Sequence, residues 1–403
     1  MLCRVAGEMK SEIRTEFIIL MQRFKALYMR ITLSVFLLII GALFWNGCKD
    51  DDPAAKVTPS NLTLEATISD DGSGIVSFVA DADDAIKYDF YFGENPGAPA
   101  VTSTDGTEQH TYLNTGTYTA SVVAYSVDNL FINKTVSVTV EVDEPAISDV
   151  GYSTPESYPN FTLVWQDEFN GTELNLEDWT HETGNGAGGW GNNELQFYQA
   201  QNTLVQDGYL TIKAKKESTG GFNYTSSRII TKGKQAFKYG RIDIRAILPK
   251  GQGIWPALWM LGSNISDVGV GWPKCGEIDI MELIGGTGTG AGRNDRIYGT
   301  VHWDNAGQYA SYGGNTTLTG GKTFADEFHV FSIIWTDTAI TWYLDDVQYH
   351  IIDITPGELN EFQKDFFFIF NVAVGGNWPG SPDATTVFPQ RMIVDYIRVF
   401  QQQ

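Results

Sequence analysis

Short stretches in which apolar and polar residues alternate run along most of the chain, and clusters of turn residues separate them. Between residues 60 and 142, clear examples are 61–65, 75–79 and 136–140. Alternation with a period of two places one set of side chains on each face of a β-strand. Strands that recur every 8–12 residues or so, with turns between them, are typical of an all-β sandwich. We therefore predict a small β-sandwich domain over residues 60–142.

The second half of the chain shows the same pattern over a longer distance. Strand-like runs occur at 161–165, 209–215, 241–247, 330–335, 340–344, 366–374 and 392–400. Helical periodicity is nearly absent, and 358–364 is the best candidate for a helix. A segment rich in Pro, Ser, Asp and Glu, 143–159, precedes these runs and is predicted to be a linker. The fold class is therefore all-β, with a large jelly-roll sandwich over residues 160–403.

One apolar run near the start of the chain has a different character. Residues 31–45 form a 15-residue, largely apolar run, whereas a membrane-spanning helix needs roughly 20 such residues. The run suits the core of a signal peptide better, although an uncleaved signal anchor is the alternative. Upstream of Met29, three glutamates interrupt the basic leader that a signal peptide requires, so we expect Met29 to be the true start.

The residues after this run resemble a bacterial lipoprotein cleavage site. Gly47 precedes Cys48, and the acidic stretch 49–52 is similar to the export signal of surface lipoproteins in Bacteroidetes. The resemblance implies a signal peptide region over 1–47, a lipid on Cys48 and a linker over 48–59. It also implies a lipid-anchored, surface-exposed place in the outer membrane of a bacterial cell envelope.

Charge limits the partners of the protein. The chain has 27 Lys and Arg against 49 Asp and Glu, a formal net charge of −22. Such a chain would repel a phosphate backbone, so no nucleic-acid partner is expected. A neutral polysaccharide carries no such penalty, and the 11 Trp, 18 Tyr and 23 Phe suit surfaces that stack on flat ligands. Three cysteines provide no disulfide framework, and no His/Cys pattern has zinc spacing.

Three carboxylates lie close together in the run 276–283. In a regular strand Glu277 and Asp279 share a face, and Glu282 points to the other side. A β-bulge around 280–281 would return Glu282 to the face of the other two. Mutual repulsion and burial would then raise at least one pKa, which suits a glycosidase that needs one ionised and one protonated carboxyl group. The alternative is a solvated edge strand whose acids discourage aggregation.

The order of motifs around these carboxylates resembles glycoside hydrolase family 16, within it the bacterial laminarinases. The matching segments are 165–169, 189–196, 227–229, 239–241, 255–259, 277–282, 370–378 and 394–399. The resemblance implies a retaining mechanism in the cleft of a concanavalin A-like jelly roll. Glu277 matches the nucleophile and Glu282 the acid/base, and Asp279 lies between them. No cofactor is expected for catalysis.

The same resemblance implies further site residues. Asn193, Glu194 and Arg228 match polar cleft positions, and Trp255, Trp259 and Trp378 are candidate sugar platforms that could equally be core residues. His302 is expected to bond Asp279 or the acid/base. The family often holds a structural Ca²⁺ away from the cleft, and Glu168, the carbonyl of Gly208 and Asp395 fall at matching positions.

The expected function is therefore endo-hydrolysis of β-1,3-glucans such as laminarin by a lipid-anchored monomer. Within the family, a mixed-linkage β-1,3-1,4-glucanase and a red-algal galactanase are the alternatives. From another class, the chain could be a glycan-binding surface lipoprotein without catalysis. Residues 110–119 and 88–93 resemble the PKD-type immunoglobulin-like module, which implies a spacer role for residues 60–142 more than a carbohydrate-binding one.

Overall fold

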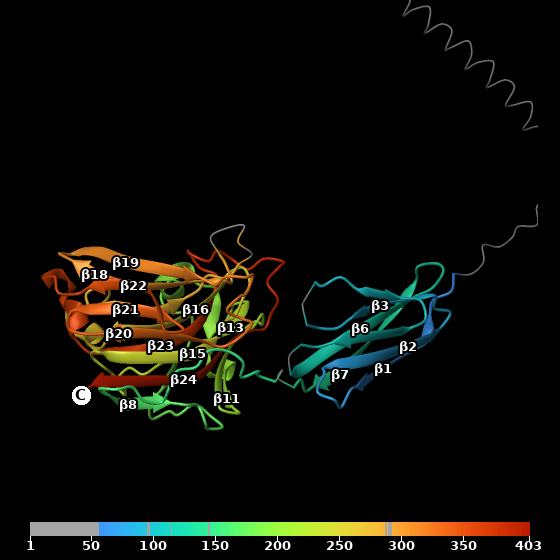
Figure 1. The fold of residues 1–403 in the computed structure, drawn as a ribbon. Helices are drawn as coiled ribbons and strands as arrows, with labels where there is room; N and C mark the ends of the chain where they lie inside the picture. Colours follow the sequence, from blue (N-terminus) through green and yellow to red (C-terminus); the bar gives the residue numbers. More distant parts are fainter. Residues whose placement is uncertain (1–55, 95–96, 114, 144–145, 287, 289–291) are drawn as a thin grey trace, which may run out of the picture. The chain divides into compact units, whose positions relative to one another are not determined.

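A computed structural model describes residues 56–403 except 95–96, 114, 144–145, 287 and 289–291 (Figure 1). The chain divides into two compact units, the first ending at Val142 and the second spanning Asp143–Gln403. The apolar run 31–45 and Cys48 lie outside the described residues. Among the residues that are described, no helix is long and apolar enough to cross a membrane.

The first unit consists of two antiparallel sheets that share one apolar core. One sheet has the order β1 (Ser60–Ile68), β2 (Ile75–Asp83), β5 (Thr107–Thr111). The other has the order β4 (Val101–Ser103), β3 (Lys87–Tyr91), β6 (Gly116–Tyr125), β7 (Phe131–Val140). Inward residues from both sheets, including Val76, Phe78, Phe90 and Val122, are at most 1% exposed. The predicted small β-sandwich is therefore present.

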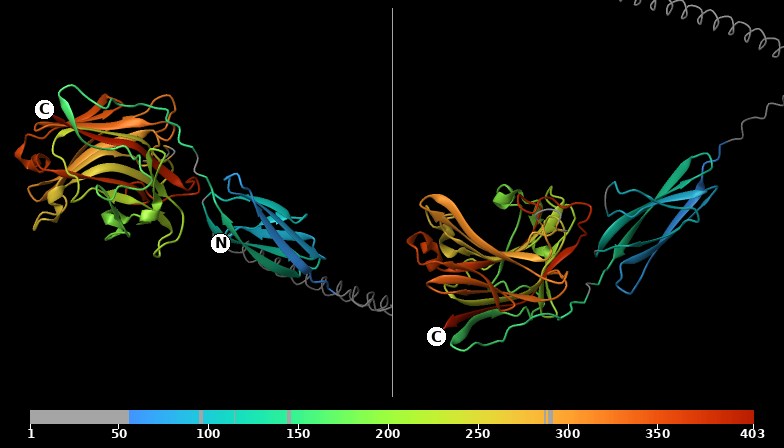
Figure 2. Two further views of the ribbon diagram at one scale, coloured as in Figure 1. Left: turned by 90° about the horizontal axis from the view of Figure 1, so that it is seen from below. Right: turned by 45° about the horizontal axis from the view of Figure 1, so that its top comes forward.

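The second unit is a jelly-roll sandwich of two larger sheets, and Figure 2 shows its layers of strands from two further directions. The sheet that carries the acidic strand, here called the cleft sheet, has the order β19 (Gln308–Thr317), β18 (Arg296–Asn305), β17 (Glu277–Glu282), β16 (Ile254–Gly262), β23 (Phe366–Val374), β14 (Arg228–Ile230), β9 (Thr180–Glu182). The outer sheet has the order β11 (Thr203–Gln206), β12 (Tyr209–Ala214), β24 (Gln390–Gln402), β15 (Gly240–Ile247), β20 (His329–Trp335), β21 (Ala339–Leu344), β22 (Val347–Asp353), with β8 (Phe161–Asp167) also on β24.

Smaller elements complete the second unit. The strands β10 (Gln196–Tyr198) and β13 (Tyr224–Ser226) pair in parallel. Short helical turns lie between strands along the chain: η1 (Gly189–Asn193), η2 (Ala200–Asn202), η3 (Ser263–Ser266) and η4 (Gly357–Gln363). Each of the seven strand-like runs predicted after residue 160 falls on a strand, and the predicted helix 358–364 is the short 3₁₀ helix η4.

The core between the two sheets explains why the strands hold their register. Strand β23 lies between β16 and β14 in the cleft sheet, and all nine of its residues are buried. Its apolar side chains Phe366, Phe368 and Phe370 belong to the same cluster as Ile242 and Ile244 of β15 from the outer sheet. A one-residue slip of β23 would exchange its two faces, which burial between the sheets strongly opposes.

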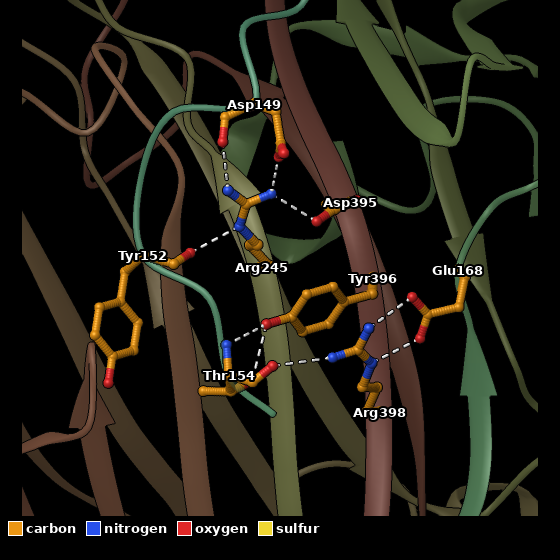
Figure 3. Close-up of polar contacts among 8 residues, drawn as sticks. All are labelled: Asp149, Tyr152, Thr154, Glu168, Arg245, Asp395, Tyr396 and Arg398. Atoms are coloured by element: carbon orange, nitrogen blue, oxygen red, sulfur yellow. Dashed lines mark hydrogen bonds and ion pairs between the residues drawn. The ribbon is translucent and has the colours of Figure 1, made fainter. Parts of the chain in front are cut away.

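Part of the predicted linker belongs structurally to the second unit. Residues 149–158, here called the strap, lie on the outer sheet, and Gly151 forms a β-bridge with Phe328. Figure 3 shows Arg245 of β15 reaching the strap at Asp149 and the carbonyl of Tyr152. The strap therefore covers buried arginines of the outer sheet, and the linker 143–159 is shorter than its composition predicts.

Candidate active site

A β-bulge in β17 brings the three carboxylates to one face of the cleft sheet. Asp279 pairs with Thr300 of β18, but Glu282 pairs with Tyr298, so β17 has one residue more than its partner strand. The pairing with β16 shifts at the same place. Ile278, Ile280 and Met281 point into the core and are at most 1% exposed. The predicted bulge is confirmed, and it turns Glu282 towards the cleft.

Each of the two glutamates accepts a hydrogen bond from a tryptophan. The indole nitrogen of Trp272 lies 2.8 Å from Oε2 of Glu277, and that of Trp255 lies 3.0 Å from Oε1 of Glu282. His302 on β18 lies with Nε2 at 3.0 Å from Oδ2 of Asp279, as the sequence predicts. These bonds hold three acidic groups in fixed orientations at the floor of the cleft.

Burial and charge repulsion raise the pKa values of the two glutamates by different amounts. Burial, followed by the charge of Asp279, raises the pKa of Glu277 to about 8. Burial also raises the pKa of Asp279, and burial with the charges of Asp279 and Glu277 raises the pKa of Glu282 well above its ordinary value. His302, Trp272 and Arg228 favour the ionised form of Glu277. Glu277 therefore loses its proton before Glu282, which is the order that a nucleophile and an acid require.

The carboxylates lie in a cleft of about 600 Å³ with aromatic walls. Its lining includes the predicted residues Glu194, Arg228, Trp255, Trp259, His302 and Trp378. Trp378 is 37% exposed and meets Trp255 edge to face, so it offers a free indole surface to a ligand. Flat aromatic surfaces beside catalytic acids suit a polymer of neutral sugar rings.

Arg228 and Glu194 occupy more enclosed positions in the wall. The guanidinium of Arg228 lies between the rings of Trp190 and Trp259, at 4.4 and 4.9 Å from their centroids, and donates to Glu182. Glu194 is 7% exposed and accepts hydrogen bonds from three neighbouring side chains, those of Asn192, Gln196 and Tyr198. Both residues therefore shape the wall as much as they offer groups to a ligand.

The cleft also contains residues that the sequence analysis did not select. Asn192, rather than the predicted Asn193, lines the cleft, because Asn193 turns its amide towards Asn377. Further lining residues are Trp190, Trp272, Tyr309 and Asn371. Trp272 had a signal in the sequence, since it lies in the Gly-Trp-Pro segment before the acidic strand. Tyr309 had no signal in the sequence, because its approach to the cleft depends on how β19 pairs with β18.

Cys275 lies directly before the catalytic strand but plays no part in this chemistry. It is fully buried, and burial raises the pKa of its thiol to about 11. A thiol that keeps its proton is a poor nucleophile.

The residues proposed for calcium lie at the outer sheet. Both oxygens of Glu168 accept hydrogen bonds from Arg398, at 2.6 and 2.8 Å, and Oδ2 of Asp395 accepts from Arg245 (Figure 3). Gly208 lies in the tight turn between β11 and β12. As arranged, the Glu168 carboxylate does not fit as a cation ligand, whereas the Gly208 carbonyl and Asp395 are oxygen donors of the kind that calcium prefers.

Comparison with known proteins identifies the second unit. Residues 191–398, just over half of the chain, match the model of the glycosyl hydrolases family 16. The chain belongs to glycosyl hydrolase family 16. A second model, for the beta-glucan synthesis-associated proteins SKN1/KRE6/Sbg1, matches residues 96–272.

Individual known proteins align with much of the chain. The Clotting factor G alpha subunit of Tachypleus tridentatus is 38% identical over 246 residues, or 60% of this chain and 34% of that protein. Glucan endo-1,3-beta-glucosidase A1 of Niallia circulans is 38% identical over 311 residues, or 69% of this chain and 44% of that protein. The chain thus spans less than half of either relative.

A solved structure of family 16 superimposes on the second unit. The laminarinase catalytic domain of Thermotoga maritima is 46% identical, with a TM-score of 0.55. The match covers 60% of this chain and 99% of that domain. The jelly-roll fold of the second unit is therefore that of a family 16 catalytic domain.

Proposed function

We propose that the protein is a retaining, endo-acting hydrolase of β-1,3-glucans such as laminarin. The observation that carries the proposal is the bulged strand β17, which places Glu277, Asp279 and Glu282 together on the floor of an aromatic cleft. The names of the relatives support the substrate, since one is a glucan endo-1,3-beta-glucosidase and another a laminarinase catalytic domain.

In the first step of this reaction, the ionised carboxylate of Glu277 attacks the anomeric carbon. Glu282 gives its proton to the glycosidic oxygen, the bond between carbon and that oxygen breaks, and a glycosyl ester forms on Glu277. In the second step Glu282, now ionised, takes a proton from water, and the hydroxyl attacks the anomeric carbon and releases Glu277. The tryptophan hydrogen bonds to both glutamates keep the two carboxyl groups aimed at the same bond.

Charge favours a neutral glucan over a sulfated galactan. The cleft contains three acidic residues on one strand, and its cation Arg228 already bonds Glu182. A sulfate group close to these carboxylates would be repelled at short range. The remaining choice within the family is between a pure β-1,3-glucan and a mixed-linkage glucan.

The test is a product profile on laminarin, barley mixed-linkage glucan and agarose. Short oligosaccharides from laminarin, absent with Glu277→Gln, would support the proposal, and the barley reaction would measure linkage preference. Release from agarose alone would replace it with a galactanase. Tight laminarin binding without release from any substrate would instead favour a glycan-binding protein.

We also propose that the protein is a monomer anchored by a lipid on Cys48 at the surface of a bacterial outer membrane, with the first unit as a PKD-like spacer. The support is the apolar run 31–45, the Gly47-Cys48 pair and the acidic residues after it. Metabolic labelling with a radioactive fatty acid should mark the native chain but not Cys48→Ala. Protease treatment of intact cells should remove the labelled chain from the surface, and light scattering should give the mass of one chain.

A structural calcium ion is the last part of the proposal. Its ligands would be the Gly208 carbonyl and Asp395, not the carboxylate of Glu168. Since both residues lie at the outer sheet, the ion would stabilise the fold without touching the substrate.

A further inference from the structure

A chain of hydrogen bonds on the hairpin of β18 and β19 ends on the catalytic strand. His302 lies with Nε2 at 3.0 Å from Oδ2 of Asp279 and 3.8 Å from Oε1 of Glu277. Its other ring nitrogen, Nδ1, lies 2.8 Å from the hydroxyl oxygen of Tyr309. The imidazole thus has a partner on each nitrogen, and one of these partners is a tyrosine outside the catalytic set.

The hairpin itself sets this geometry. Ala306 and Gly307 form its two-residue turn with φ values of 52° and 86°, the conformation that matches the twist of paired strands. In this register Tyr309 lies opposite Asp304, so it is the diagonal neighbour of His302 on the same face. The tight turn therefore fixes the register that places the Tyr309 hydroxyl beside the imidazole, and no long loop is involved.

The chemistry of the two partners selects one form of the imidazole. Once Asp279 is ionised, above its raised pKa of about 8, it only accepts hydrogen bonds, so Nε2 of His302 must then carry a hydrogen. In a neutral ring Nδ1 is then an acceptor, which suits the hydroxyl of Tyr309 as donor. We propose that Tyr309 is a positioning residue that holds His302 as the neutral Nε2–H tautomer, aimed at Asp279.

The charge of His302 matters because several acids surround it. Glu277 and Asp279 of β17 lie beside its ring, Asp304 of its own strand shares its face, and Tyr309 approaches from β19. A positive charge on His302 also acts on Glu282, where it favours the ionised form. Glu282 has to keep its proton to act as the acid, so a neutral His302 protects that proton.

The ring packing around Tyr309 allows its hydroxyl to be tested separately from its ring. The ring of Tyr309 lies 5.7 Å from that of His302 and 5.4 Å from that of Trp272. Tyr309→Phe keeps these ring contacts and removes only the hydroxyl. A matched control is Tyr312→Phe, because Tyr312 lies on the same strand, is 51% exposed against 54% for Tyr309, and points to the opposite face.

The first measurement is ¹⁵N NMR of the imidazole nitrogens in the full chain, labelled at its five histidines. The signals of His302 are those missing from His302→Gln. At a pH above 8, where Asp279 is ionised, we expect the neutral Nε2–H pattern in the native chain and in Tyr312→Phe. In Tyr309→Phe we expect a mixture of tautomers and protonation at higher pH. Identical His302 signals in Tyr309→Phe and the native chain would overturn the proposal.

The second measurement is turnover of laminarin, and this part rests on the proposed function. One neutral hydrogen bond contributes about 1 kcal/mol, so Tyr309→Phe should lower kcat about 5-fold and leave KM within about 2-fold. The alkaline limb of its pH profile should move to lower pH, because a charged His302 favours loss of the Glu282 proton.

Two outcomes distinguish the positioning role of Tyr309 from direct sugar contact and from a failure of the proposed function. A raised KM with unchanged kcat and pH profile would make Tyr309 a sugar-contacting residue and overturn the positioning role. If even the native chain releases nothing from any glucan, the proposed function fails, but the nitrogen spectra still decide the tautomer.

Discussion

Two groups of acidic residues, one on each sheet of the second unit, have the same chemistry and opposite surroundings. In the cleft, Glu277, Asp279 and Glu282 form no ion pair with an arginine or lysine of the described residues. On the outer sheet, Glu168 bonds Arg398 and Asp395 bonds Arg245.

The presence or absence of an arginine partner changes the acidity of these buried carboxyl groups. Burial raises the pKa of the cleft acids, and His302, the indole donors and the more distant charge of Arg228 oppose it only in part. On the outer sheet burial still raises the pKa of Asp395, but the fold supplies a guanidinium beside it. A buried carboxylate with an arginine partner has a structural role here, whereas burial without such a partner leaves Glu282 with a proton to transfer.

The largest expected effect is on catalysis. Glu277→Gln or Glu282→Gln should lower kcat on laminarin by about 10³-fold or more, because each removes one of two required carboxyl groups. The fold should remain, as measured by circular dichroism. Glu168→Gln on the outer sheet is the control and should keep native kcat. A loss of activity in the control, or near-native turnover in either cleft variant, would contradict the assignment of catalysis to the cleft acids and of a structural role to the outer-sheet acids.

The next effect is on stability. Arg245 is 3% exposed and bonds Asp149, Asp395 and the carbonyl of Tyr152. Arg245→Met would leave Asp395 without its cation and should lower the free energy of unfolding by about 3 kcal/mol, measured with urea. Lys322→Met, which breaks the exposed pair with Glu327, should cost less than about 1 kcal/mol. Equal losses in the two variants would show that burial of the pair is unimportant.

The pH dependence of stability should differ between the two groups. Asp279 has a raised pKa in the folded state, so the native protein binds a proton that the unfolded chain releases. Its contribution to stability is greatest at low pH and is lost as pH rises from about 4 to about 8. Asp279→Asn should therefore raise Tm at pH 8 by about 2 °C or more and change it little at pH 4.5.

Asp243 provides the matching control on the outer sheet. It is fully buried and accepts hydrogen bonds from Arg241 and Tyr158. Asp243→Asn should lower Tm at both pH values, because it removes the charge that Arg241 needs. Scanning calorimetry at the two pH values checks both variants, and a lower Tm for Asp279→Asn at pH 8 would contradict the account of the cleft.

The smallest expected effect concerns calcium. If Gly208 and Asp395 hold an ion, a chelator should lower Tm by a few °C, since loss of a bound ligand acts by mass action on the native state alone. Turnover at moderate temperature should stay the same, and excess Ca²⁺ should restore Tm. An unchanged Tm in chelator would mean that the arginines alone satisfy this part of the outer sheet.

The sequence predicted much of the catalytic strand correctly. The spacing of Glu277, Asp279 and Glu282 required an extra residue for a common face, and the bulge lies where it was expected. His302 also bonds Asp279 as predicted. The polar composition of the strap predicts a linker, yet its residues bond arginines about 90 to 250 positions away in the chain.

The fold class, the strands and the acidic strand follow from local sequence pattern, because side-chain period and bulge geometry depend on neighbouring residues. Which acids have arginine partners, and that Tyr309 reaches His302, follow only from tertiary packing. Those contacts join strands whose pairing and register are set by burial between two sheets, and no short stretch of sequence contains that information.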